Sequence, residues 1–88
     1  MENVRLTLYV VGNNNKADKA IANLRKLCEQ QLGKDYTLTI VNVIEEPDKA
    51  ERAKILATPT LIRESPLPAR RLIGDMSNIN CLKQFVFT

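Results

Sequence analysis

The sequence predicts a single α/β domain, and three observations carry this prediction. A strand-like apolar run, an amphipathic helical segment and a second strand-like run follow one another in the first half of the chain. A helix between two strands favours a right-handed, parallel β-α-β unit. The 88 residues, 44% of them hydrophobic and 26% charged, are enough for one soluble globular domain and too few for a second. We therefore expect one domain over residues 1–88.

The first half is expected to contain two strands and one long helix. In residues 4–11 apolar and polar side chains alternate at first, and the later residues are all apolar. This pattern is typical of a strand that becomes buried on both faces. Gly12 and the three asparagines after it are expected to form a turn. Asn15 is a candidate cap for a helix over residues 16–32, which is expected to end at Gly33. Apolar side chains recur in this helix at three- and four-residue spacing, which predicts one buried face. Residues 36–44 are the second expected strand.

The second half is organised around a proline corner at Thr58-Pro59. Proline fixes its own φ and pushes the preceding residue away from the α region, so the chain must turn there. A cis bond is an option open at this position. Before the corner we expect a short helix over residues 48–56. After it we expect two strands, over residues 60–63 and 69–74, that pair as a hairpin.

The last segment allows two interpretations. Asp75 or Ser77 can cap a helix with Ile79, Leu82, Phe85 and Val86 on one face. The ending Phe85-Val86-Phe87, taken alone, is equally strand-like. The capping and spacing signals agree with each other, so we expect the helix. The expected order of elements is then β-α-β-α-β-β-α.

Cysteine and histidine content excludes several kinds of chemistry. Cys28 and Cys81 form no C-x-x-C pair and no metal-ligand spacing, so both are expected as buried thiols. The amino terminus lacks the pattern of a secretory signal, so we expect a cytoplasmic protein without disulfides. The chain has no histidine, which removes Ser-His and Cys-His catalysis and imidazole ligands. We expect no catalytic residue, no cofactor and no metal.

Charge and aromatic content narrow the range of partners. The net charge of +3 and the few aromatic side chains disfavour nucleic-acid binding, and no membrane partner is expected. A mild positive charge favours acidic protein surfaces. A redox enzyme would need a nucleophilic thiol at the start of the first helix, where the sequence has asparagines and Lys16. A protein-binding module is therefore the preferred interpretation.

Three blocks of sequence carry a resemblance to a known family. They are Leu8-Tyr9-Val10 with Gly12-Asn13, then Lys54-Ile55-Leu56-Ala57-Thr58-Pro59-Thr60-Leu61, and then Pro68 with Arg70-Arg71-Leu72-Ile73-Gly74-Asp75. On these blocks the chain resembles the KaiB family of cyanobacterial circadian clock proteins over nearly its whole length. The expected order of elements is that of a thioredoxin-like domain, and the amino-terminal sensor domain of the kinase SasA is similar to KaiB in fold.

The resemblance implies a non-enzymatic clock component. KaiB-like proteins bind the phosphorylated KaiC ATPase ring, sequester KaiA and compete with SasA for the ring. The resemblance also implies a metamorphic protein, with an alternative ground-state fold of order β-α-β-β-α-α-β that forms a homotetramer. We expect the monomeric thioredoxin-like state to dominate. Two other interpretations are a divergent KaiB-like adaptor in stress or other signalling, favoured by the asparagine run after Gly12, and a thioredoxin-like redox protein.

Nine residues are expected to matter for binding or for the fold. Basic residues flanking the corner and the paired strands are expected to contact an acidic surface on the ring; they are Lys54, Arg63, Arg70 and Arg71. Residues expected to shape the fold or a switch between folds are Gly12, Thr58, Pro59, Gly74 and Asp75. The alternative for Arg70 and Arg71 is that they only solvate an edge strand.

Overall fold

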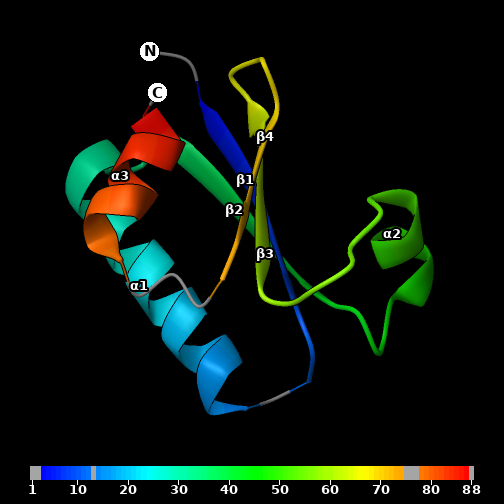
Figure 1. Cartoon of the computed structure of the whole chain (residues 1–88). Coiled ribbons are helices and arrows are strands. Elements are labelled where there is room, and N and C mark those ends of the chain that lie inside the picture. Colours follow the sequence, from blue (N-terminus) through cyan, green and yellow to red (C-terminus); the bar gives the residue numbers. More distant parts are fainter. Residues whose placement is uncertain (1–2, 13, 75–77, 88) are drawn as a thin grey trace.

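The computed structural model describes residues 3–12, 14–74 and 78–87. Its elements follow the predicted order, and the last segment is the helix that we expected (Figure 1). The elements are β1 (Val4–Val10), α1 (Asn15–Leu32), β2 (Tyr36–Asn42), α2 (Pro47–Arg52), β3 (Thr60–Ser65), β4 (Arg70–Ile73) and α3 (Ile79–Phe87). The mixed α/β class predicted from the sequence is confirmed.

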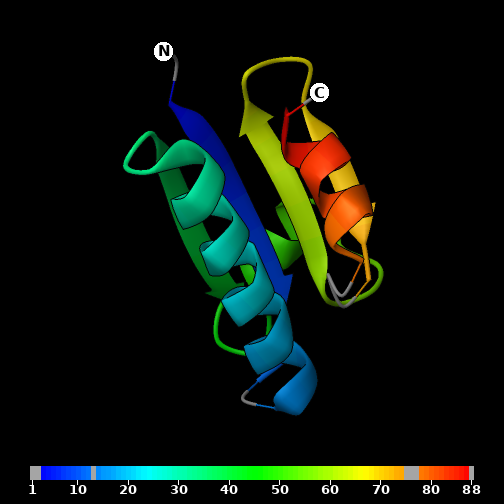
Figure 2. The ribbon, with the colours of Figure 1, turned by 90° about the vertical axis from the view of Figure 1, so that its left-hand side faces the viewer.

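The four strands form one sheet in the order β2-β1-β3-β4. β1 pairs with β2 in parallel, and β3 pairs antiparallel with both β1 and β4. The predicted parallel β-α-β unit and the predicted hairpin are both present. α1 and α3 lie on one face of the sheet, and α2 lies on the other, as the two views in Figures 1 and 2 show.

The hydrophobic core lies between the sheet and the pair α1 and α3. Alternate residues of β1 point to this face, as the two-residue period of a strand requires. They pack against the apolar face predicted for α1 and against α3. Burying a leucine side chain contributes roughly 1.5–3 kcal/mol, so the leucines of this layer contribute strongly to stability. Among the core residues are Val4, Leu6, Leu8, Val10, Ala20, Leu24, Cys28, Leu61, Leu82, Phe85 and Val86.

The caps of α1 differ slightly from the expectation. Asn14, and not Asn15, is the amino-terminal cap, because its Oδ1 accepts a hydrogen bond from the Ala17 N–H at 2.8 Å. At the other end Gly33 has a φ of 61°, and its N–H donates to the Glu29 carbonyl. The helix therefore begins one residue before the predicted start and ends at the predicted glycine.

α2 is shorter than predicted, because the chain leaves the helix after Arg52 and not near Leu56. Lys54 takes a left-handed conformation with a φ of 56°. The Lys54 N–H donates to the Glu51 carbonyl, and the Ile55 N–H donates to the Ala50 carbonyl. These two bonds are the Schellman arrangement that ends many helices, usually with glycine at the left-handed position. Lysine at this position gave no such signal in the sequence.

The start of α3 and one of the two cysteines also differ from the expectation. Asn78 Oδ1 accepts a hydrogen bond from the Cys81 N–H at 3.0 Å, so Asn78 caps this helix. The predicted caps, Asp75 and Ser77, lie outside the described residues. Cys28 is buried as predicted, but the prediction that Cys81 is buried is wrong. Cys81 lies on the outward side of α3, away from the core residue Leu82.

Candidate interaction surface

The two consecutive arginines of β4 point to opposite faces of the sheet, because side chains alternate along a strand. Arg70 lies opposite Arg63 of the neighbouring strand β3. The guanidinium carbon of Arg70 lies 5.9 Å from the centre of the Phe85 ring on α3. Arg71 is paired with Ile62 and faces α2. The two arginines are both exposed, but they do not form a single patch.

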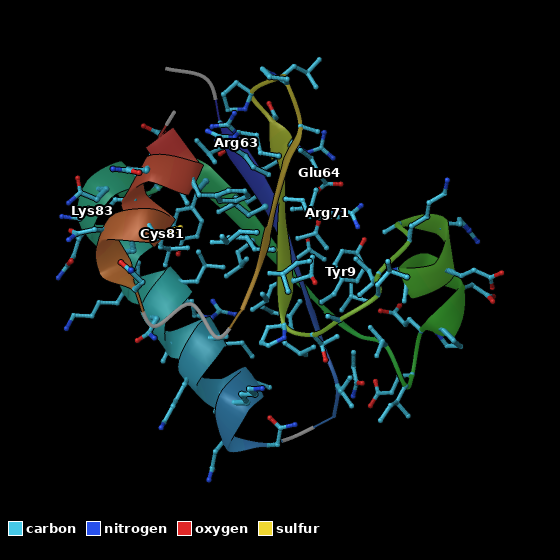
Figure 3. All side chains as sticks on the ribbon, in the orientation of Figure 1. Tyr9, Arg63, Glu64, Arg71, Cys81 and Lys83 are labelled. Atoms are coloured by element: carbon cyan, nitrogen blue, oxygen red, sulfur yellow. The ribbon has the colours of Figure 1, made fainter. Side chains whose placement is uncertain are left out.

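Arg71 joins β4 to the end of α2. Its Nη2 donates to the Ala53 carbonyl at 2.6 Å, and its Nη1 donates to the Lys54 carbonyl at 3.0 Å. A cation at this position is favourable because the carboxyl end of a helix carries partial negative charge. Figure 3 shows the Arg71 side chain on the α2 side of the sheet. The structure therefore brings together the predicted residues Lys54 and Arg71, which we call the α2–β4 corner.

Arg63 corrects one of the predictions, because only 2% of its surface is exposed. The register of β3 places Arg63 on the same face as Leu61, toward α1 and α3. Its Nη1 donates to the carbonyls of Phe85 and Val86, both at 3.3 Å, and its Nη2 donates to the Pro68 carbonyl at 3.2 Å. Arg63 anchors the carboxyl end of α3 and does not face a partner in this fold.

The Pro59 corner is held by several local contacts. The Thr58–Pro59 peptide bond is cis, and Pro59 is buried. The Thr60 Oγ1 donates to the Ala57 carbonyl at 2.6 Å. The Gly74 N–H donates to the Pro59 carbonyl at 3.0 Å, which joins the corner to the end of β4. Asp75, predicted to act with Gly74, lies outside the described residues.

Asn42 is a structural residue that the sequence analysis missed. Its Oδ1 accepts hydrogen bonds from the N–H groups of Gly12, at 3.1 Å, and Ile44, at 3.0 Å. Gly12 has a φ of 58°, which favours the glycine found there. The Asn42 side chain therefore connects the turn after β1 to the turn after β2. An asparagine at the end of a parallel strand, next to a glycine turn on its neighbour, was the available signal.

Redox chemistry has little support in the arrangement of the thiols. The start of α1 carries Asn14, Asn15 and Lys16, and no cysteine. Cys28 is buried in the carboxyl-terminal half of α1, and burial raises the pKa of its thiol to about 11. A thiol with so high a pKa is a poor nucleophile at neutral pH, because the thiolate is the reactive form.

Residues 3–12, 14–74 and 78–87 contain neither a candidate metal site nor a candidate membrane-spanning helix. Within these ranges no group of three or more cysteine, aspartate or glutamate side chains could hold a metal ion. No helix in the same ranges is both long and apolar enough to cross a membrane.

Solved structures with the same fold include the SasA amino-terminal domain and a thioredoxin. The amino-terminal domain of SasA from Synechococcus elongatus has a TM-score of 0.78 at 19% identity, covering 97% of this chain and 84% of that domain. Mitochondrial thioredoxin 3 from Saccharomyces cerevisiae has a TM-score of 0.77 at 18% identity, covering 98% of this chain and 78% of the thioredoxin. At these identities the likeness establishes a thioredoxin-like fold and no more.

Sequence comparison identifies the family. The KaiB domain family matches residues 7–86. The circadian clock protein KaiB3 of Synechocystis sp. is 46% identical over 78 residues, which cover 89% of this chain and 76% of the relative. The circadian clock oscillator protein KaiB of Synechococcus elongatus is 44% identical over 73 residues, covering 83% of this chain and 72% of the relative. The chain therefore belongs to the KaiB domain family of circadian clock proteins.

Proposed function

We propose that this chain is a non-enzymatic, cytoplasmic clock component that binds the phosphorylated KaiC ATPase ring, sequesters KaiA and competes with a SasA-type kinase. One observation carries the proposal: a chain 44–46% identical to KaiB clock proteins adopts the same fold as the SasA amino-terminal domain, despite only 19% identity to it. Two proteins that share a backbone shape can compete for one surface on a ring. The monomer in this fold is the binding form.

The α2–β4 corner is the part of the predicted site that best suits an acidic partner. The Lys54 side chain is exposed, and Arg71 is held beside it by its two bonds to backbone carbonyls. Cations on an exposed rim raise the association rate and the salt dependence of binding. Arg70 contributes from the opposite face of β4. Arg63 is left out of the proposed contact set because it is buried.

The clean test is a charge reversal at Lys54. The hydrogen bonds of Lys54 are made by its backbone N–H and carbonyl groups and not by its side chain. The Lys54→Glu substitution therefore keeps the hydrogen bonds that stabilise the α2–β4 corner. We expect affinity for a phosphorylated KaiC ring to fall about tenfold at low salt, and the loss to shrink as salt screens the charges. Biosensor titrations at two salt concentrations measure both effects.

The matched control is Lys26→Glu, which makes the same charge change on an exposed position of α1. This variant should bind the ring with nearly wild-type affinity. Equal loss in both variants would show that net charge matters and position does not. No loss in Lys54→Glu would place the ring contact away from the α2–β4 corner.

A further inference from the structure

The two edges of the sheet differ in how they are protected against pairing with another chain. β4 is short and carries Arg70 and Arg71, and the segment before it contains Pro66 and Pro68. Short length, charged side chains and prolines all discourage an edge strand from pairing. β2 forms the opposite edge, and its seven residues include no charged residue and no proline. Its register with β1 is continuous from end to end. β2 is therefore the unprotected edge.

The backbone of β2 has a row of groups that point away from the sheet. The Val43 N–H donates to the Val10 carbonyl of β1 at 2.8 Å. Because backbone groups alternate in direction along a strand, the odd-numbered residues of β2 face β1. The groups of Tyr36, Leu38 and Ile40 point outward, and β2 is the outermost strand on this side of the described sheet (Figure 2). These three residues offer donors and acceptors to another strand.

The side chains of β2 form one apolar face and one hydroxyl-bearing face. Tyr36, Leu38 and Ile40 are half-buried and pack against the hydrophobic core from its margin. Thr37 and Thr39 point to the other face of the sheet, and both are exposed. A strand added beside β2 would extend the apolar layer on one face and the hydroxyl layer on the other.

The helix beside this edge places one charge of each sign near it. Burial and the Glu29 carboxylate raise the pKa of Tyr36, and the Arg25 guanidinium lowers it. A second copy of the chain at this edge would therefore bring a cation and an anion of its own, and not two like charges.

The sequence of β2 is complementary to itself in the antiparallel direction. A two-fold axis at Leu38 places Tyr36 opposite Ile40 of a second copy, and Leu38 opposite its own counterpart. These are the outward-pointing residues, so each pair can exchange two backbone hydrogen bonds. On the other face the same axis places Thr37 opposite Thr39 of the second copy. Aromatic with β-branched and threonine with threonine are favourable cross-strand pairs.

We propose that β2 pairs with β2 of a second copy of this chain, antiparallel about Leu38, so that the two sheets become one. Such a dimer is symmetric and closed, and the arginines of β4 oppose growth beyond it. The interface is small, so we expect a Kd of roughly 0.1 mM, and the chain stays mostly monomeric at micromolar concentration. The α2–β4 corner lies toward the opposite edge and remains accessible, so this dimer does not depend on the proposed clock function.

Sedimentation equilibrium of the full chain, from about 10 µM to about 1 mM, tests the dimer. We expect the average mass to rise from that of a monomer toward that of a dimer and no further. In the same range the ¹⁵N-labelled amides of Leu38 and Ile40 should shift and become protected from hydrogen exchange. The Thr39 amide, which already faces β1, should gain little protection. A constant monomer mass, growth beyond a dimer, or shifts confined to another surface would overturn the proposal. If a strand of a different protein is the true occupant of this edge, the first of these results is expected.

Two variants test the register. Thr39→Lys and Thr37→Glu should each weaken self-association about tenfold, because each places two like charges at diagonal positions across the axis. An equal mixture of the two variants should associate about tenfold more tightly than either alone, because the register sets the introduced lysine opposite the introduced glutamate.

The matched control is Gln84→Lys, which adds the same charge as Thr39→Lys at an exposed position of α3. This control should dimerise like the wild-type chain, and circular dichroism should show that all three variants are folded. An equal loss in Gln84→Lys would show that net charge and not the β2 edge controls association. No recovery in the mixture of folded variants would contradict pairing about Leu38.

Discussion

Two helices of this domain end against an arginine from the sheet, and the two contacts differ in burial. Arg63 of β3 is almost fully buried and donates to carbonyls at the end of α3. Arg71 of β4 is exposed and donates to carbonyls at the end of α2. The helices differ in the same sense, because α3 contributes Leu82 to the core and α2 has no buried residue. α3 is part of the core, whereas α2 is attached at the surface by hydrogen bonds and turns.

Among the substitutions that test this comparison, Arg63→Met should have the largest effect on the free energy of unfolding. Methionine fills part of the space but leaves the carbonyls of Phe85 and Val86 without their donor, and unsatisfied buried acceptors are costly. The Pro68 carbonyl, which is only partly buried, also loses its donor. We expect the free energy of unfolding to fall by about 3 kcal/mol, measured by urea unfolding followed by circular dichroism. Arg70→Met, at an exposed position on the same face, is the control and should cost less than about 1 kcal/mol. A loss below 1 kcal/mol in Arg63→Met would contradict the anchoring role.

Arg71→Met makes the corresponding change on the α2 side. Its two acceptors are exposed to water, which replaces the lost donors, so we expect a loss of only about 1 kcal/mol in the free energy of unfolding. Amide exchange in α2 should accelerate while exchange in α3 stays unchanged. If Arg71→Met cost as much as Arg63→Met, the two contacts would be equivalent and the comparison would fail.

The placement of these arginines shows how much the sequence could predict. Alternation and helical spacing predicted β1, the apolar face of α1 and the order of all seven elements, because each pattern reports directly which side chains are buried. Arg63 was misplaced because a charged residue was assumed to be exposed. The two-residue period of a strand places Arg63 on the same face as Leu61. The missing information was the register of β3, which determines that this face is the buried one.

The candidate site was less predictable than the fold. Arg70 and Arg71 were grouped as partner-binding residues without regard to strand alternation, which places consecutive side chains on opposite faces and could have been applied to the sequence. The end of α2 could not have been predicted in the same way, because Lys54 takes a left-handed conformation without glycine. The hydrogen bonds of Asn42 depend on how two separate turns meet, which local patterns do not report.

A smaller effect on stability comes from the thiol of Cys28, which is buried, whereas the thiol of Cys81 is exposed. Burial raises the pKa of Cys28 to about 11 from an ordinary value of 9.0, whereas Cys81 is exposed. The folded chain keeps the Cys28 proton at pH values where the unfolded chain has lost it. The contribution to stability is therefore complete below pH 9 and is lost as the pH rises toward 11.

Unfolding measured between pH 8 and about 11 tests this point, with Cys28→Ala as the comparison. The wild-type chain should lose stability more steeply with pH than Cys28→Ala does. A thiol reagent at neutral pH should modify Cys81 in the folded chain and Cys28 only after unfolding. Parallel pH profiles for the two proteins, or rapid modification of Cys28 in the folded state, would show that Cys28 is not shielded.

Native-state hydrogen exchange followed by NMR tests the contrast between the two helical layers most directly. The amides of Leu24 in α1 and Leu82 in α3 should exchange only when the whole domain unfolds, because both side chains are fully buried in the core. The amides of Ala50 and Ala53 at α2 should exchange about a hundredfold faster, through local opening that leaves the core intact. Equal protection at all four amides, lost together in one cooperative step, would contradict the view that α2 is held at the surface.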